Sequence, residues 1–228
     1  MECQLQKNWY RACMTTSLPT ATRRRARGEL TRKGEQTRLR IVRAAAELVL
    51  EQGVAGTTLD EVRAVAGVSS SQIYHYFADK QALIRAVIEL QADTIMGTQE
   101  PALAAVDGLA GLRSWRDSIV QYQREADCRG GCPLGSLGSE LADNYDDARR
   151  DVAAGFGRWE KVICSALRRM QARGELAADA NPDDLATATL AALQGGLLLT
   201  QIEKSTRPLE TALDTMISLI ASRLTSTG

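Results

Sequence analysis

Two helix-starting signals in close succession constrain the fold of this chain more than any other feature. Thr58-Leu-Asp-Glu61 and Ser69-Ser-Ser-Gln72 both have the pattern of a capping box, in which a hydroxyl and a long polar side chain satisfy free backbone N–H groups. Gly67 lies between them and permits the backbone turn that ends the first short helix. Two short helices joined by a tight turn, between longer helices, indicate a helix-turn-helix.

The segments on both sides are expected to be helical. Apolar residues recur at three- and four-residue spacing from Leu39 to Leu50, in a helix that Gly53 stops. Asp79 can cap a connecting helix that follows the second box. Later apolar patterns predict helices over roughly 109–127, 137–145, 148–173, 182–203 and 208–224. Strand-like alternation does not occur over any length, so the sequence predicts an all-α chain.

Composition excludes several classes of protein. The 228 residues are 44% apolar, which is enough for a buried core, but no run of about 18 apolar residues predicts a membrane span. The first residues lack the apolar block of a secretory signal, and Met14 is a second possible start. Five scattered cysteines fit a reducing compartment better than a disulfide framework, so a cytoplasmic location is expected.

The zero net charge of the chain hides a basic segment. Between Ala21 and Ala45 nine basic residues face only Glu29 and Glu35, which leaves a local net charge of +7 and −7 on the remainder. Such a segment favours nucleic acid or an anionic surface as partner, although a solubilising tail is an equal alternative. Residues 1–30 lack periodicity and are expected to form a disordered basic arm.

The helix expected over 69–77 has two different faces. Ile73 and Phe77 are four residues apart, so both can pack, with Val68, against the preceding helices. The opposite face carries side chains that suit a DNA major groove: Ser70, Ser71, Tyr74 and His75.

Enzymatic use of the only histidine, His75, or of Cys132 is the alternative from another class. His75 has no carboxylate partner in local spacing, and the sequence has neither a Gly-rich phosphate loop nor a nucleophile elbow. We therefore expect no enzyme, no catalytic residue and no cofactor.

From about residue 36 to residue 90 the sequence resembles the DNA-binding domain of the tetracycline-repressor (TetR) family of bacterial transcription regulators. The resemblance rests on an ordered set: Thr37-Arg-Leu-Arg-Ile41, Ala44-Ala45, Gly53, Thr57-Thr58, Ala66-Gly67-Val68-Ser69, Ile73-Tyr74, Phe77, Lys80 and Leu83. Arg63 departs from it, because the family usually has a small alanine there. Arg63 can reach a phosphate or loosen the packing of the first two helices.

The resemblance implies that the 69–77 helix enters the major groove. By position, Ser70, Ser71, Gln72 and His75 then face bases, Thr58, Tyr74, Tyr76 and Lys80 face phosphates, and Thr37 is a further candidate contact. Gln72 has a competing role, because the capping box would fold it back onto its own helix.

The resemblance also implies the domain organisation. The basic arm (1–30) precedes a DNA-binding domain at 31–80, a connecting helix at 80–96, and a ligand-binding and dimerisation domain at 97–228. In the family the last two helices pair across a two-fold axis, so candidate interface residues are Leu193, Gly196, Leu197, Leu209, Leu213, Met216 and Ile220. An ordinary intrachain core is the alternative for each of them. Gly195-Gly196 weakens a helix interior unless it permits close helix approach.

A Gly-rich loop runs from Cys128 to Cys132 and continues as Pro-Leu-Gly-Ser-Leu, which resembles a subgroup of the family with a GCPLGSL-like segment. Cys132 can be a small buried residue, or a redox or electrophile sensor whose pKa is lowered by the helix N-terminus and Arg129. Metal binding needs more ligands than two cysteines supply. Candidate residues for a hydrophobic ligand pocket, or for plain core, are Trp115, Tyr122, Cys132, Phe156, Trp159 and Cys164.

The sequence therefore favours a homodimeric repressor that binds a palindromic operator and is released by a small hydrophobic inducer. A thiol-based regulator that uses Cys132 shares the DNA-binding domain and differs only in its trigger.

Overall fold

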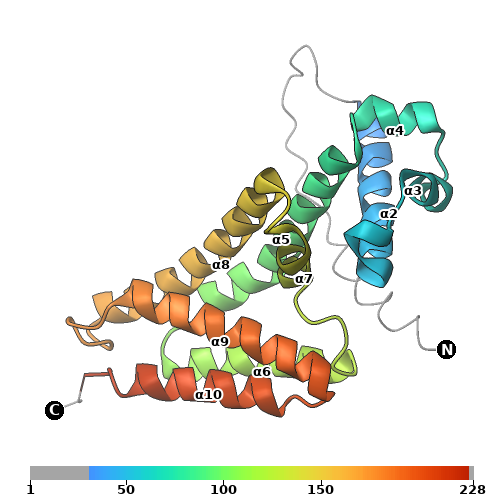
Figure 1. The fold of residues 1–228 in the computed structure, drawn as a ribbon. Coiled ribbons are helices and arrows are strands. Elements are labelled where there is room, and N and C mark those ends of the chain that lie inside the picture. The colour runs from blue at the N-terminus through green and yellow to red at the C-terminus, as the bar shows by residue number, and fades with distance from the viewer. Residues whose placement is uncertain (1–30, 226–228) are drawn as a thin grey trace.

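The computed structural model describes residues 31–225, and these residues form nine helices. The expected basic arm (1–30) lies outside the described residues. Figure 1 shows the helices in chain order: α2 (Arg32–Gly56), α3 (Leu59–Ala66), α4 (Ser70–Tyr76), α5 (Lys80–Ala104), α6 (Leu109–Glu125), α7 (Pro133–Leu141), α8 (Asp146–Ala172), α9 (Pro182–Glu203) and α10 (Arg207–Ala221). The all-α fold class is confirmed.

The helices form a small and a large unit. α2, α3 and α4 pack together at one end, and α5 runs from them into a larger bundle in which α8, α9, α6 and α10 lie in layers (Figure 1). α7 lies between the two units and packs against α8, α5 and α2. The small unit is thereby attached to the large one through a continuous helix and through a second element.

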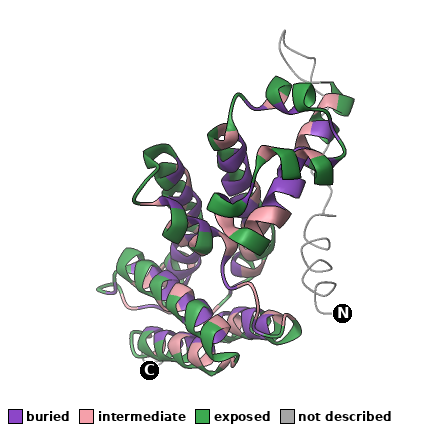
Figure 2. Cartoon of the chain, turned by 45° about the vertical axis from the view of Figure 1, so that its right-hand side comes forward, coloured by how far each residue is buried: buried purple, intermediate pink, exposed green. Residues whose placement is uncertain are grey.

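Apolar faces turn inward along each helix, as the purple segments of Figure 2 show. In the small unit the core includes Ile41, Val62, Ile73 and Phe77, all at most 3% exposed. One continuous cluster of buried side chains links this core to that of the large unit. A shared core of this kind transmits displacement of one unit to the other.

Two helices differ clearly from those expected. α7 runs from Pro133 to Leu141 instead of 137–145, because Pro133 occupies the first turn and Cys132 acts as its N-cap. α5 continues through Gly97 to Ala104, beyond the expected end at residue 96. Gly97 and the polar residues after it do not end α5, because Met96 before them and Leu103 after them are both buried in the core.

Gly53 breaks α2 as expected. Its backbone angles, φ 74° and ψ 172°, are non-helical, and one short turn follows before Gly56. The hydroxyl of Thr57 donates to the carbonyl of Gly53 (2.8 Å) and secures that turn. The chain then enters Thr58, the N-cap of α3.

Candidate nucleic-acid interface

Both capping boxes form, and they set the geometry of the helix-turn-helix. Thr58 Oγ1 accepts from Glu61 N (3.2 Å), while Glu61 Oε2 accepts from Thr58 N (2.9 Å). The Thr58 hydroxyl also donates to Glu61 Oε2 (2.8 Å), and this bond, together with the one from Thr58 N, lowers the pKa of the Glu61 carboxyl. Gly67 has φ 61°, the left-handed conformation expected at the end of α3. The caps fix where α3 ends and where α4 begins.

α4 has a buried packing face and an exposed polar face. Ile73 and Phe77 are buried, as is Val68 in the preceding turn. All of the outward residues expected from the sequence are exposed, with Tyr74 60% exposed: Ser70, Ser71, Tyr74 and His75. The His75 and Tyr76 rings meet edge to face, with 4.8 Å between centroids. Hydroxyl, phenol and imidazole groups therefore project from one side of a short, capped helix.

Gln72 caps its own helix. Its Oε1 accepts from Ser69 N (2.9 Å), and Ser69 Oγ accepts from Gln72 N (3.2 Å). The structure thus supplies the folding role that the sequence left open for this residue. The side chain is exposed, on the same end of α4 as Ser70 and Ser71.

The other candidate DNA contacts divide into exposed and buried ones. Thr58 is exposed, and Tyr76 and Lys80 are half-buried. Thr37 is buried, and its hydroxyl donates to the carbonyl of Lys33 (3.0 Å), so the free chain presents little of this side chain to DNA. It lies on the side of α2 that packs inward. Arg63 faces solvent beside Asp60, which is compatible with a phosphate contact and not with a packing defect.

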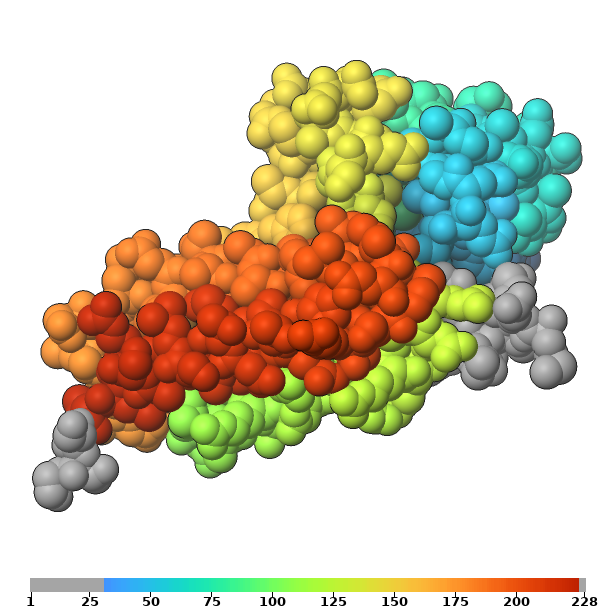
Figure 3. Space-filling model, turned by 60° about the horizontal axis from the view of Figure 1, so that its bottom comes forward, coloured from blue at the N-terminus to red at the C-terminus, as the bar shows by residue number. Residues whose placement is uncertain are grey.

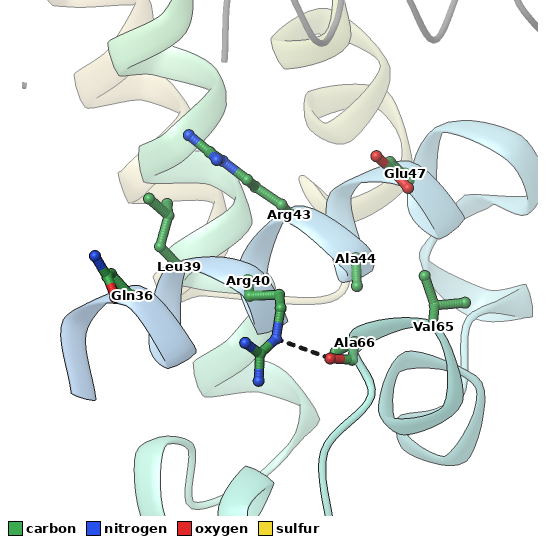
Figure 4. Close-up of a pocket in the computed structure, with 8 residues that line it drawn as sticks. All are labelled: Gln36, Leu39, Arg40, Arg43, Ala44, Glu47, Val65 and Ala66. Carbon is green, nitrogen blue, oxygen red and sulfur yellow. Dashed lines mark hydrogen bonds between the residues drawn. The ribbon is translucent and has the colours of Figure 1, made fainter. Parts of the chain in front are cut away.

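Two arginines of α2 contact the ends of α3 and α4. Arg40 Nε donates to the carbonyl of Ala66 at the end of α3 (2.9 Å), as Figure 4 shows. The Arg38 guanidinium lies over the Phe77 ring, 5.4 Å from its centroid. An open groove of about 390 Å³ lies along α2 next to Arg40 and reaches the exposed Val65. Sequence reasoning missed these roles, because nothing in the local pattern links residue 40 to residue 66.

The residues expected at a dimer interface lie inside the single chain. α9 packs along α10, and the seven candidates face that contact or the core: Leu193, Gly196, Leu197, Leu209, Leu213, Met216 and Ile220. An alanine Cβ at Gly196 would lie 2.9 Å from the Leu209 Cα, so this glycine permits the close approach of the two helices. The residue assignment is therefore corrected: these side chains are intrachain core.

A different face of α9 and α10 is apolar and exposed. On α9 it includes Leu198 (57% exposed), Leu199 (46%) and Ile202 (66%), and Leu219 (43%) lies on α10. In Figure 3 these two helices, orange and red, lie side by side across the near face of the molecule. By length and composition α9 could also cross a membrane, although 39% of its apolar window is buried within the chain. Core helices of the same composition are common in globular proteins.

Five of the six pocket candidates belong to α6 and α8, and the sixth, Cys132, is the N-cap of α7. Trp115, Cys132, Trp159 and Cys164 are buried, and Tyr122 and Phe156 are half-buried. Trp115 Nε1 donates to Gln99 of α5 (2.8 Å). Trp159 Nε1 is buried without a hydrogen-bond partner among the described residues. Buried donors of this kind are what a polar ligand atom would satisfy.

The structure places Cys132 as the small buried residue that the sequence allowed, and it does not show the activated thiol of the alternative. Burial raises the pKa of its thiol, and hydrogen bonds from Gly135 and Leu134 of the helix N-terminus offset this only in part. Burial also raises the pKa of Cys164, whose Sγ donates to Asp183 (3.3 Å). The Arg168 guanidinium lowers the pKa of the Asp183 carboxyl.

The described residues offer no metal site: among residues 31–225 no three His, Cys, Asp or Glu side chains lie close enough together to hold a metal ion.

Comparisons with known proteins agree on both units. Residues 41–87 match the family described as bacterial regulatory proteins, tetR family, and residues 108–216 match the tetracyclin repressor-like C-terminal domain. The transcriptional regulator AcuR of Cereibacter sphaeroides is 31% identical over 74% of this chain and 78% of its own. The repressor DhaR of a Mycobacterium species is 28% identical over 76% and 86%. The crystal structure of regulatory protein TetR from Rhodobacter sphaeroides has a TM-score of 0.70 at 27% identity and covers 83% of this chain and 99% of its own.

Proposed function

Because the chain belongs to the TetR family of transcriptional regulators, we propose that it is a homodimeric repressor that binds a palindromic DNA operator and is released by a small hydrophobic inducer. Membership makes it a DNA-binding regulator and not an enzyme, and several relatives are named repressors. The domain boundaries proposed are those at residues 31–80 and 97–228, with residues 80–96, the first part of α5, as the connection, and the proposed location is the cytoplasm.

The observation that carries the proposal is the exposed polar side of α4. Ser70, Ser71 and His75 project from a helix that is capped at its start and buried on its other side. Side chains of these types hydrogen-bond base edges in a major groove. Tyr76 and Lys80, at the end of α4 and the start of α5, are placed to hold the DNA backbone, which fixes register without reading sequence.

The dimer is proposed to use the exposed apolar face of α9 and α10. Ala188, Ala191 and Gly195 continue the face of Leu198, Leu199 and Ile202 along α9, and all are exposed. No Asp, Glu, Lys or Arg lies between Asp184 and Glu203. A contiguous apolar surface of this length is unusual on a monomer and is typical of a subunit interface.

The inducer site is proposed among the middle helices, near Trp159 and Cys132. Trp159 supplies a large apolar surface and an unpaired N–H, and the Gln194 side chain, which lies against Gly135 and hydrogen-bonds the Cys132 thiol, supplies a polar group. A hydrophobic compound with a hydrogen-bond acceptor would satisfy this combination. The GCPLGSL-like subgroup stays part of this proposal. The raised pKa of the Cys132 thiol gives no support to the redox alternative.

The test is the selection of genomic DNA fragments by the purified full-length chain. We expect enrichment of fragments with two inverted half-sites about one helical turn (~34 Å) apart. Enrichment without a shared sequence would contradict an operator-specific role, since phosphate contacts alone do not discriminate between sequences. The genes next to the selected fragments would also indicate the inducer class.

A further inference from the structure

Glu140, at the end of α7, connects the large unit to the DNA-binding unit. Its Oε2 accepts from the backbone N–H of Val54 (2.8 Å), and its Oε1 accepts from that of Ala55 (2.7 Å). The two residues of α2 and the carboxylate are more than eighty positions apart in sequence. Both carboxylate oxygens are used, one for each N–H, so the contact fixes orientation as well as distance.

The break in α2 at Gly53 frees the two N–H groups that donate to Glu140. In a continuous helix the N–H groups of Val54 and Ala55 would donate to carbonyls one turn earlier. Because Gly53 has φ 74°, these groups point out of the helix instead. A Cβ at position 53 would lie 3.3 Å from each Glu140 oxygen, so glycine permits both the turn and the approach of the carboxylate.

The contact lies directly in front of the recognition unit. Thr57, whose hydroxyl donates to Gly53, follows the two donors, and Thr58 then caps α3. Glu140 is thereby joined, through two residues of α2 and Thr57, to the first residue of the helix-turn-helix. The Glu140 contact thus holds the unit before α3, whereas α5 holds it after α4.

The other end of α7 is held in the proposed inducer region. Cys132 Sγ caps its first turn by accepting from Gly135 N (3.4 Å), and a Cβ at Gly135 would lie 3.1 Å from Gln194 of α9. Gly138 packs closely against Val152 of α8. A nine-residue helix thus has one end against α9 and the other on α2, as its place between the units in Figure 1 illustrates.

We propose that Glu140 is a positioning residue for DNA binding, which holds the helix-turn-helix at one fixed orientation to the dimer body. The proposal rests on the proposed function. In a dimer, two heads held in this way match a single half-site spacing, and a displaced α7 alters that spacing. Glu140 touches no base, so its loss should change geometry and not base preference.

The experiment compares full-length wild type, Glu140→Ala and Glu140→Gln on a DNA fragment selected by the wild type. One base pair is inserted at or deleted from the centre of the fragment. We expect wild type to lose roughly tenfold or more in affinity on either change, and Glu140→Ala to lose less than about threefold. A base change within a half-site should cost both proteins the same factor. Glu140→Gln retains one acceptor oxygen and should be intermediate.

Asp143→Asn is the matched control, because it removes an exposed negative charge near the end of α7 and leaves Glu140 in place. It should keep the wild-type dependence on spacing. The same dependence in Glu140→Ala and wild type would overturn the positioning role.

Amide hydrogen exchange at Val54 and Ala55 tests the contact without DNA. Exchange should accelerate about tenfold or more in Glu140→Ala, since each N–H loses a charged acceptor. Unchanged exchange would overturn the contact itself. If wild type binds no fragment with two half-sites, the proposed function fails and the positioning role fails with it, while the exchange result still shows whether Glu140 holds α2.

Discussion

Single side chains of the recognition helix divide into those that fold it and those available to DNA. Ser69 and Gln72 exchange backbone hydrogen bonds at the start of α4, while Ser70 and His75 make none that hold the helix in place. Removing a capping side chain costs about 1 kcal/mol of stability. Removing an exposed side chain costs little in the free protein. The two kinds of residue should therefore respond differently to substitution.

Combining Ser71→Ala with His75→Ala should weaken operator binding and leave folding intact. Each lost base contact costs about 1–3 kcal/mol, so the double variant should bind at least tenfold more weakly in a gel-shift titration. Ser69→Ala is the comparison, because it should lower the free energy of unfolding by about 1 kcal/mol. Unchanged operator affinity in the double variant would remove α4 from the DNA interface.

The reactivity of Cys132 toward oxidants and alkylating agents depends on the fraction of its thiol that is ionised. Because burial raises the pKa of the thiol, the folded protein holds less thiolate at neutral pH than an ordinary cysteine does. Alkylation of Cys132 by iodoacetamide, followed by peptide mass spectrometry, should be slow in the folded chain and fast in denaturant. Mild peroxide should leave Cys132 and DNA binding unchanged. Rapid modification with loss of DNA binding would restore the thiol-based alternative.

At the scale of helices, local signals predicted beginnings better than ends. The caps at Thr58, Ser69, Asp79 and Asn181 all form as expected, because a capping pattern and its hydrogen bonds involve neighbouring residues. The end of α5 depends instead on what its last turns pack against, and sequence spacing does not contain that information. For the same reason the apolar stripe of α10 did not reveal whether its partner is α9 or a second chain.

The close contact of α9 and α10 gives a stability prediction. Gly196→Ala should destabilise the protein by about 1–3 kcal/mol, because the new Cβ would meet the Leu209 backbone. Gly97→Ala is the matched control: it lies in α5 with no atom within 4 Å of the added Cβ, and should stabilise by roughly 0.5–1 kcal/mol. Urea unfolding of the two variants measures both effects. Equal stability of the two would contradict the close helix approach.

At the scale of the whole molecule, the exposed polar face of α4 could be predicted, and the way its unit is attached to the rest of the chain could not. Ser70, Ser71 and His75 belong to one short motif, so their common side followed from helical geometry. Glu140 lies in another unit, and only the folded chain brings it to Val54 and Ala55. The sequence likewise shows that α9 is apolar, but which of its residues are exposed depends on how α9 packs against α8 and α10.

Because Leu199 and Ile202 are exposed and Leu213 is buried, only the exposed pair is suited to a test of dimer formation. Leu213→Glu would place a charge in the core of the single chain, where Leu213 is fully buried, and should unfold it instead of separating two subunits. Leu199→Glu with Ile202→Glu places charges on the exposed face, so each chain should keep its helical content and melting cooperativity. Sedimentation velocity should then report monomers for this variant and dimers for wild type.

A monomer presents only one α4 to DNA, so it should lose most of the affinity that comes from engaging two half-sites while keeping weak, salt-dependent binding. Thr215→Glu on α10 extends the test, because Thr215 is exposed beside the same apolar face and its charge should also weaken association. Arg223→Glu, at an exposed position beyond the end of α10, should leave the dimer intact. A Leu199→Glu/Ile202→Glu chain that still sediments as a dimer would move the subunit interface away from the exposed face of α9.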